Sequence, residues 1–195
     1  MSAGHRREKV MFVALMILFA LPVLVALGLH SFVPDWRPWG TSNNGTFVTP
    51  PREVSFTTLE ASDGLSLDAL RGKWILLVVG TDCSERCRAL LHMTKQVQIA
   101  LGREANRVAR LYISNRDAAL PSAISLVREN PGLRVATASS QWFKQMSLDR
   151  DWVMRADRVY IIDPRGYLMM EYPKDIDGGG IRTDLKRLLK ASRGG

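Results

Sequence analysis

Cys83 and Cys87 are the only cysteines in the 195-residue chain, and their type and spacing could do chemistry. They lie four positions apart, where the apolar run W-I-L-L-V-V at 74–79 gives way to a helix-like pattern. Such a pair could form a stabilising disulfide, a reversible redox couple or a site for a soft metal ion. A disulfide that closes so short a loop removes little chain entropy, because the gain grows with loop length. The spacing therefore favours redox or metal chemistry over an inert staple.

The turn from strand to helix would place the sulfur of Cys83 near the N-terminus of the helix. Free backbone N–H groups and the helix dipole stabilise a thiolate at that position. Arg86 and Arg88 add positive charge nearby, while Glu85 opposes it. Cys87 lies about one turn further along and presents its sulfur on the same helix face. A one-turn spacing falls within the roughly 4.4–6.8 Å between Cα atoms that a disulfide needs, so reversible oxidation is geometrically reasonable.

The same two thiolates could hold Cu(I), a soft ion that prefers sulfur and accepts few ligands. A closed zinc site is less suitable, since it needs four ligands and the chain offers two thiolates. Met154 is a weaker candidate for a further copper ligand, because methionine is also an ordinary core residue. His92 falls roughly 140° further round a helix than Cys87, so it is predicted to be a partly buried helix residue facing elsewhere. Met169 and Met170 are predicted to be strand residues rather than a copper relay.

The residues on either side of the cysteines predict a mixed α/β domain. Continuous apolar runs with β-branched residues mark two core strands, at 74–79 and 108–113. Shorter runs predict four further strands, at 54–59, 133–136, 159–162 and 167–171, and a D-P-R-G turn joins the last two. Helical patterns cover 67–70, 84–101, 121–129, 141–148 and 180–191. A parallel half joined to an antiparallel half, with helices on both faces, resembles the thioredoxin-like plan, although periodicity alone supports only an α/β sandwich.

The N-terminal part of the chain is typical of a membrane anchor. Residues 10–29 carry no charge, and twenty helical residues match the roughly 30 Å hydrocarbon core of a bilayer. Arg6, Arg7 and Lys9 precede this run and predict that the N-terminus stays in the cytoplasm. A cleaved signal peptide is the alternative, but its apolar core is usually shorter, and A-L-G at 26–28 is a weak cleavage site.

The chain is predicted to have four parts: a cytoplasmic tail at 1–9, a transmembrane helix at 10–30, a Pro/Gly-rich spacer at 31–53 and a folded domain at 54–195. A single pass through the inner (plasma) membrane would leave the domain in the periplasm or otherwise outside the cytoplasm. Such compartments are oxidising, so neighbouring cysteines do not remain thiols there unaided. The net charge of +8 is scattered and accompanies no nucleic-acid-binding motif, which argues against nucleic acid as a partner.

The start of the folded domain resembles the TlpA and Sco/SenC branches of the thioredoxin superfamily. The stretch D-G-L-S-L-D-A-L-R-G-K-W-I-L-L-V-V-G-T-D-C-S-E-R-C at 63–87 is similar to their lead-in, core strand and cysteine turn. The three residues between Cys83 and Cys87 resemble the Sco/SenC spacing, whereas thioredoxin and TlpA have two. The later stretch V-Y-I-I-D-P-R-G-Y-L-M-M-E-Y at 159–172 also resembles the hairpin of Sco proteins.

This resemblance implies a thioredoxin-like fold and a membrane-anchored protein that assists assembly of the copper site of cytochrome c oxidase. Proteins of that family are associated with delivering copper or keeping the copper-site cysteines reduced. The implied partner is an oxidase subunit or another respiratory assembly factor. Arg155 falls on the position of the family's copper-ligand histidine, and no histidine follows His92. No proline precedes the strand at 159–162 either, so the sequence resembles a divergent Sco protein that lacks the copper-ligand histidine.

Three functions stay open on the sequence alone. Cys83 and Cys87 could serve oxidase assembly, through thiol–disulfide exchange or through Cu(I) handling. They could instead belong to a general periplasmic thiol–disulfide oxidoreductase, in which Cys83 attacks and Cys87 resolves the mixed disulfide. In the third case the domain is a non-catalytic interaction module for an oxidase subunit, and the cysteines are secondary.

Overall fold

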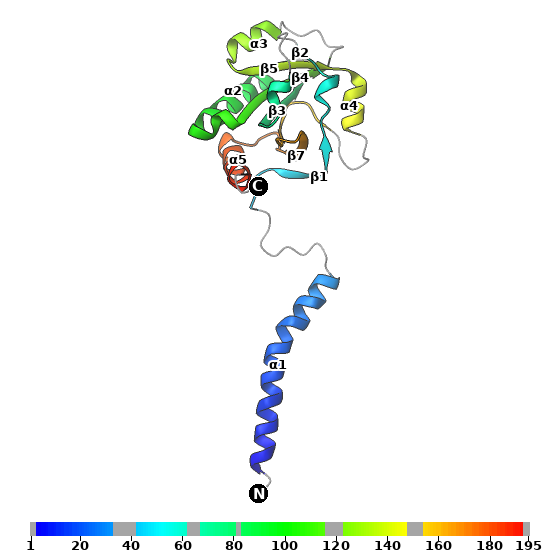
Figure 1. The fold of residues 1–195 in the computed structure, drawn as a ribbon, viewed down its shortest axis with the longest axis vertical. Helices are drawn as coiled ribbons and strands as arrows, with labels where there is room; N and C mark the ends of the chain where they lie inside the picture. The colour runs from blue at the N-terminus through cyan, green and yellow to red at the C-terminus, as the bar shows by residue number, and fades with distance from the viewer. Residues whose placement is uncertain are drawn as a thin grey trace. The chain divides into compact units, whose positions relative to one another are not determined.

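The computed structural model describes residues 3–32, 42–61, 67–80, 83–115, 123–147 and 154–192. The chain divides into two compact units, Met1–Ser42 and Asn43–Gly195. The elements, labelled in Figure 1, are α1 (Ala3–Phe32), β1 (Thr46–Glu53), η1 (Phe56–Thr58), β2 (Glu60–Ala61), η2 (Leu67–Leu70), β3 (Trp74–Gly80), α2 (Glu85–Ala100), η3 (Gly102–Arg107), β4 (Val108–Asn115), α3 (Ala123–Glu129), β5 (Leu133–Ala138), α4 (Ser140–Met146), β6 (Arg158–Ile162), β7 (Tyr167–Glu171) and α5 (Gly178–Ala191). The elements labelled η are short 3₁₀ helices.

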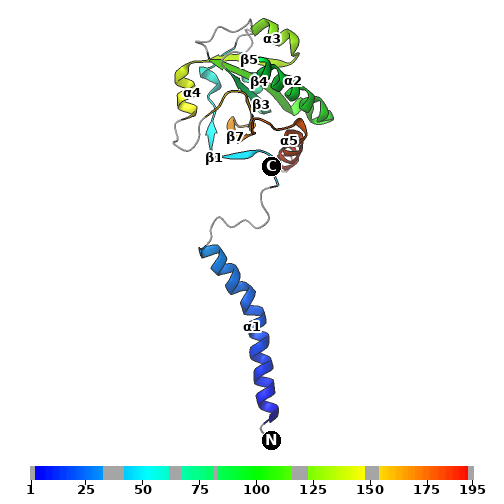
Figure 2. The same ribbon diagram turned by 180° about the vertical axis from the view of Figure 1, so that it is seen from behind.

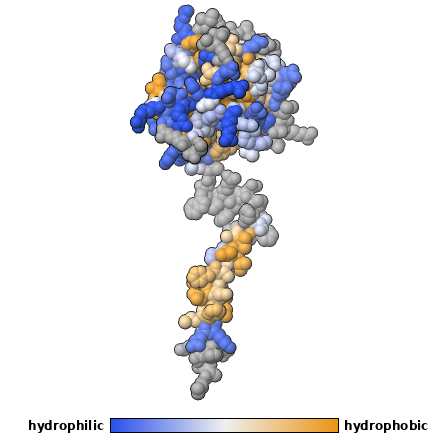
Figure 3. Space-filling view, viewed as in Figure 1, coloured by the Kyte–Doolittle hydropathy of each residue, from blue (hydrophilic) through white to orange (hydrophobic). Residues whose placement is uncertain are grey.

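Helix α1 makes up the described part of the first unit. Its segment Glu8–Gly28 is long and apolar enough, by length and composition, to cross a membrane. The 21 residues of this segment rise about 31 Å as an α-helix, close to the thickness of a bilayer's hydrocarbon core. Figure 3 shows apolar side chains along its surface and hydrophilic ones at its N-terminal end. The helix includes residues 10–30, and their crossing of a membrane stays a prediction.

The second unit is built on a seven-stranded mixed sheet with the order β1-β7-β6-β3-β4-β5-β2. The central strands β3, β4 and β5 run parallel to one another, whereas β6 pairs antiparallel with β3 and β7 antiparallel with β6. All seven residues of β3 are buried, as expected for a strand covered on both faces. The predicted union of a parallel half with an antiparallel half is therefore confirmed.

Helices cover both faces of this sheet and divide the core into two clusters. On one face, Leu76 of β3 packs in a cluster with Leu91 of α2 and Leu185 of α5. On the other face, Leu77 packs in a cluster with Trp142 of α4. Figures 1 and 2 show α2 and α5 together on one side of the sheet and α4 on the other. Successive residues of β3 belong to opposite core clusters because side chains alternate between the two faces of a strand.

The edge strand β1 lies within the stretch for which the composition predicted a spacer. Its residues 46–53 pair antiparallel with β7, and Val48 is its one buried side chain. Two prolines are tolerated there because an edge strand has one side on which no ladder hydrogen bond is needed. The second unit accordingly begins at Asn43 rather than at residue 54.

The strand predicted at 54–59 was wrong. Val54 and Leu59 are buried, but the residues between them form the 3₁₀ turn η1 and are exposed or half-buried. The backbone N–H of Val54 donates to the carbonyl of Gly166 in the β6–β7 turn at 2.8 Å. Two buried residues five positions apart thus anchor a turn, a pattern that sequence periodicity does not separate from a short strand.

Candidate functional site

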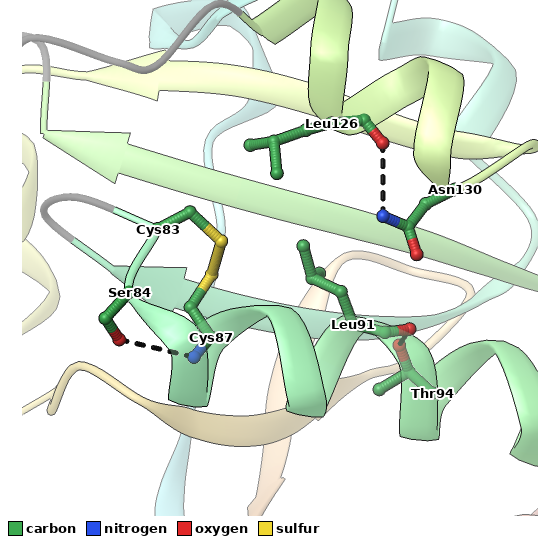
Figure 4. The surroundings of a disulfide bond; sticks show 7 residues. All are labelled: Cys83, Ser84, Cys87, Leu91, Thr94, Leu126 and Asn130. Carbon is green, nitrogen blue, oxygen red and sulfur yellow. Dashed lines mark hydrogen bonds between the residues drawn. A yellow bond between two sulfur atoms is a disulfide. The ribbon is translucent and has the colours of Figure 1, made fainter.

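Cys83 and Cys87 are joined by a disulfide at the point where the chain passes from β3 to α2. Their Cα atoms lie 5.1 Å apart, inside the range expected for cysteines one helical turn apart. Ser84 is the N-cap residue of α2, and its hydroxyl oxygen accepts the backbone N–H of Cys87 at 3.4 Å (Figure 4). The cap fixes the start of the helix between the two cysteines, so both sulfurs lie at its N-terminal end.

The disulfide is nearly enclosed by apolar side chains. Cys83 is 6% exposed and Cys87 is fully buried, and both belong to the core cluster beneath α2. Leu91 of the next helical turn and Leu126 of α3 point toward the disulfide (Figure 4). An apolar surrounding disfavours a thiolate, whereas the helix N-terminus favours one, so the two effects oppose each other at this site. Of the two cysteines, Cys83 keeps the larger exposed fraction.

The charged residues of the motif lie on the outer surface. Glu85, Arg86 and Arg88 are exposed. The guanidinium of Arg86 donates a hydrogen bond to the backbone carbonyl of Lys174, which precedes α5. This bond ties the first turn of α2 to the connection between β7 and α5.

The buried side chain of Tyr112 leaves no room for a side chain at Gly80, the last residue of β3. A side chain added at Gly80 would place its Cβ 2.9 Å from the hydroxyl of Tyr112, which is fully buried on β4. Gly80 thus lets the phenol lie close under the backbone that leads to Cys83. This contact was not predictable from the sequence, because a glycine between an apolar run and polar residues indicates only the end of a strand.

The segment around Arg155, which the sequence analysis aligns with the copper-ligand histidine of Sco proteins, is held by Tyr160. The phenol of Tyr160 accepts the backbone N–H of Arg155 at 2.8 Å and donates to its carbonyl at 2.9 Å. The backbone N–H of Asp157 donates to the carbonyl of Val79 at 2.8 Å, so this segment lies against the end of β3. The side chain of Arg155 itself is exposed.

The structure does not bring the other sequence-predicted candidates to the cysteines. Met154 is buried in the core cluster on the α4 side of the sheet, opposite the cluster that holds the disulfide. His92 is exposed on α2, so the prediction that it is partly buried was wrong. Met169 and Met170 are residues of β7, as predicted. Within the described ranges, no group of three or more His, Cys, Asp or Glu residues could hold a metal ion.

Sequence reasoning missed a buried carboxylate, Asp184, on the inner side of α5. It is 2% exposed and accepts the backbone N–H groups of Asn44 and Gly45 at 2.8 and 2.9 Å, and the hydroxyl of Tyr172 at 3.2 Å. A Cβ at Gly45 would lie 2.8 Å from the ring of Tyr172, so only glycine fits this approach. The available signal was an acidic residue directly before Leu185, on the apolar side of an amphipathic pattern.

Alkaline unfolding should report on Tyr160. Burial raises its pKa to about 12, and burial together with the charge of Asp184 raises the pKa of Tyr172 in the same direction. The unfolded chain therefore loses phenolic protons near pH 10 that the folded chain retains, so stability is full below pH 10 and falls as pH rises toward 12. Tyr160→Phe should reduce this fall by about 1–3 kcal/mol between pH 10 and 12. Urea unfolding of the full chain in detergent, monitored by near-ultraviolet circular dichroism, measures it.

Tyr167→Phe is the matched control for this experiment, because it removes an exposed phenol from the same hairpin. Its stability should fall with pH as steeply as that of the parent chain. If the stability of Tyr160→Phe fell as steeply with pH as that of the parent chain, the phenol of Tyr160 would not be the cause of the alkaline loss of stability.

The mixed sheet, the helices on both faces and the disulfide at the β3–α2 turn define a thioredoxin-like domain with a cysteine pair between its central strand and the following helix. The family described as "transmembrane-like, thioredoxin-like, C-terminal domain" matches residues 74–192. The chain belongs to this family. No curated protein matches the chain by sequence.

Solved structures of Sco proteins share this fold. ScoI of Arabidopsis thaliana with copper bound has a TM-score of 0.54 at 19% identity, over 78% of this chain and 99% of that one. Apo Sco1 of Thermus thermophilus has a TM-score of 0.55 at 17% identity, over 77% and 99%. BsSco is described as a Sco-family cytochrome c oxidase assembly protein with a disulfide switch. It has a TM-score of 0.52 at 18% identity, over 72% of this chain and 95% of that one. These likenesses confirm the predicted thioredoxin-like fold and show that it is the fold of Sco proteins.

Proposed function

We propose that this chain is a membrane-anchored, Sco-like protein that assists copper-site assembly in cytochrome c oxidase by thiol–disulfide exchange. The observation that carries the proposal is the Cys83–Cys87 disulfide at the N-terminus of α2, in a domain with the fold of Sco proteins. One solved structure of that fold is described as a disulfide switch in an oxidase assembly protein, which supports the same use of the cysteine pair here.

The exchange runs through Cys83. In the reduced chain, the thiolate of Cys83 attacks a disulfide of the partner, forming a mixed disulfide and releasing one partner thiol. The thiolate of Cys87 then attacks the sulfur of Cys83, which restores the disulfide of this chain and releases the second partner thiol. Two electrons pass to the partner, whose cysteines become able to bind copper. A dithiol reductant of the same compartment must reduce the Cys83–Cys87 disulfide for the next turnover.

The donor set favours exchange over tight copper holding. Cys83 and Cys87 supply two soft sulfur ligands, which suit Cu(I) as cargo after reduction of the disulfide. The third ligand expected from the family is replaced by Arg155, and Met154 packs on the other side of the sheet. Copper would therefore be held by two thiolates and released readily, whereas the disulfide needs only the two cysteines.

The anchor is part of the proposal. With α1 across the inner (plasma) membrane and the basic N-terminus in the cytoplasm, the domain works on the outer side, in the periplasm or an equivalent space. An oxidising compartment forms the disulfide, which is why a reduced partner site needs a dedicated reductant there. The oxidase subunit that carries the copper site, or another assembly factor, is the partner that such a position reaches.

The test separates exchange from copper handling and from simple binding. A strain that lacks the chain is supplied with the parent, Cys83→Ser/Cys87→Ser or Arg155→His, and oxidase activity and oxidase copper are measured. We expect the double variant to fail, and Arg155→His to raise Cu(I) retention in anaerobic titration without being needed for activity. Full activity of the double variant would contradict the proposal and favour an interaction module. Catalysed reduction of many unrelated protein disulfides would favour a general oxidoreductase instead.

A further inference from the structure

Ser114, near the end of β4, carries a buried hydroxyl that has no partner. The residue is 0% exposed, and among the side chains that the structure describes its Oγ is buried without a hydrogen bond. Two other buried polar side chains near the disulfide are paired. The hydroxyl of Thr94 donates to the carbonyl of Leu91 at 2.9 Å. The side-chain amide of Asn130 donates to the carbonyl of Leu126 at 3.1 Å (Figure 4). An unpaired hydroxyl in the core costs free energy, because burial removes water and the fold supplies no bond in return.

This hydroxyl lies on the same face of the sheet as the disulfide. Tyr112, two residues earlier on β4, belongs to the core cluster that contains Cys83 and Cys87. Side chains two positions apart on a strand point to the same face, so Ser114 faces this cluster as well. In the parallel pairing of β3 with β4, Ser114 lies beside Gly80, which precedes Cys83 by three positions. The unpaired hydroxyl therefore belongs to the same buried layer as the two sulfurs.

The two redox states of the cysteine pair offer this hydroxyl different acceptors. In the oxidised chain both sulfurs are neutral, and neutral sulfur accepts hydrogen bonds only weakly. Reduction separates the sulfurs, and a sulfur that carries negative charge accepts a much stronger hydrogen bond. Charge on a sulfur in apolar surroundings is disfavoured unless a donor is nearby. Cys87 is fully buried whereas Cys83 is 6% exposed, so Cys87 has the greater need of a donor from the protein.

We propose that the hydroxyl of Ser114 donates a hydrogen bond to the sulfur of Cys87 in the reduced chain, directly or through one water molecule. The hydroxyl is then unpaired in the disulfide state and paired in the dithiol state, so it favours reduction of the pair. The inference rests on the exchange proposed above and deepens it, because a favoured dithiol is regenerated more easily by the reductant of the compartment. Ser114 is a positioning residue in this scheme: it transfers no proton and forms no covalent bond.

The test is the redox equilibrium of the full chain in detergent with glutathione, compared between the parent chain and Ser114→Ala. Reduction of the Cys83–Cys87 disulfide joins two glutathione molecules in one disulfide and passes their two electrons and two protons to the cysteines. We expect Ser114→Ala to lower the equilibrium constant for reduction at least about fivefold. Acid quenching, alkylation of the free thiols in denaturant and intact-mass measurement give the reduced fraction.

Thr94→Val is the matched control for this equilibrium. It removes a buried hydroxyl near the disulfide whose hydrogen bond lies within α2. Because that bond does not depend on the redox state, the equilibrium constant should change by less than about twofold.

Urea unfolding of each redox state supplies a second measurement, in which the two states should respond differently. The urea midpoint of oxidised Ser114→Ala should equal or exceed that of the oxidised parent, because the change removes an unpaired hydroxyl from the core. The midpoint of the reduced variant should fall, because a hydrogen bond is lost. Thr94→Val should lower the midpoint alike in both states.

The outcomes separate this inference from the exchange itself. Equal equilibrium constants in the parent and Ser114→Ala would overturn the inference and leave the exchange intact. An equal fall of the urea midpoint in both redox states would also overturn it, since a buried water would then pair the hydroxyl in both. A parent disulfide that neither glutathione nor dithiothreitol reduces would contradict the proposed exchange, and with it this inference.

Discussion

Replacement of Asp184 by alanine is expected to lower the free energy of unfolding of the domain by about 3–5 kcal/mol. Its carboxylate accepts the backbone N–H groups of Asn44 and Gly45 and the hydroxyl of Tyr172, at 2.8, 2.9 and 3.2 Å. Alanine would leave these donors without a partner in a buried site, at about 1–3 kcal/mol each. Such a loss is a large share of the roughly 5–15 kcal/mol that stabilises a typical domain. Urea unfolding of the full chain in detergent measures it.

The controls for this prediction separate the carboxylate from its surroundings. Asp184→Asn keeps the shape and one acceptor oxygen, so its loss should be smaller than that of alanine. Asp175→Ala removes an exposed carboxylate just before α5 and should change stability by less than about 0.5 kcal/mol. Hydrogen exchange at 44–48 should accelerate in Asp184→Ala, because β1 loses the contact that fixes its start. A loss below about 1 kcal/mol would refute the role of Asp184 as the anchor of the N-terminal segment.

The elements that hold the dithiol were predictable because their patterns are local. The run at 74–79 could be assigned to a buried strand, since six apolar residues with β-branching fit a covered sheet, and all of β3 is buried. The helix predicted at 84–101 begins at Glu85 after a serine cap, where the apolar run gives way to helical periodicity. The Asp163–Gly166 turn joins two antiparallel strands because its aspartate accepts the N–H of Tyr167 at 2.8 Å, a local bond that the residue types favour.

The contacts that were not predictable join residues far apart in the chain. Strand β1 forms by pairing with the edge of β7. The residues of β1 themselves, with two prolines and few apolar side chains, indicate a spacer. Arg110 lies in a predicted core strand and is 1% exposed; its guanidinium donates to the side chain of Gln98, on α2. Desolvation by burial lowers the pKa of Arg110. Neither the pairing of β1 with β7 nor the hydrogen bond between Arg110 and Gln98 produces a periodic pattern within a single segment of the sequence.

The candidate site was predictable at the cysteines and not beyond them. Their spacing alone limited the chemistry to a disulfide or a two-sulfur site. The position of Met154 could not be predicted without the sheet, because the sheet separates the core cluster that contains Met154 from the one that contains the disulfide. The alignment of Arg155 with the copper-ligand histidine of Sco proteins stays a prediction, whereas the hydrogen bond of its backbone N–H to the phenol of Tyr160 comes from the fold.

The two cysteines are expected to differ sharply in trapping a partner. The reduced Cys87→Ser variant should form a stable mixed disulfide with oxidised glutathione at Cys83, because no resolving thiol remains. Cys83→Ser should form that adduct at least about tenfold more slowly, since Cys87 is fully buried whereas Cys83 is 6% exposed. Intact-mass measurement of the full chain in detergent, after timed quenching with acid, gives both rates.

Unfolding supplies the control that assigns this difference to burial. In urea, both variants should react with glutathione at similar rates, because the fold no longer covers Cys87 and the helix N-terminus is gone. If the native Cys83→Ser variant reacted as fast as Cys87→Ser, Cys83 would not be the attacking residue. Slow reaction of both native variants would instead mean that the apolar cluster around Leu91 and Leu126 must open before exchange. A mixed disulfide on Cys83 alone is the result that fits the exposed fractions, because Cys83 is 6% exposed and Cys87 is fully buried.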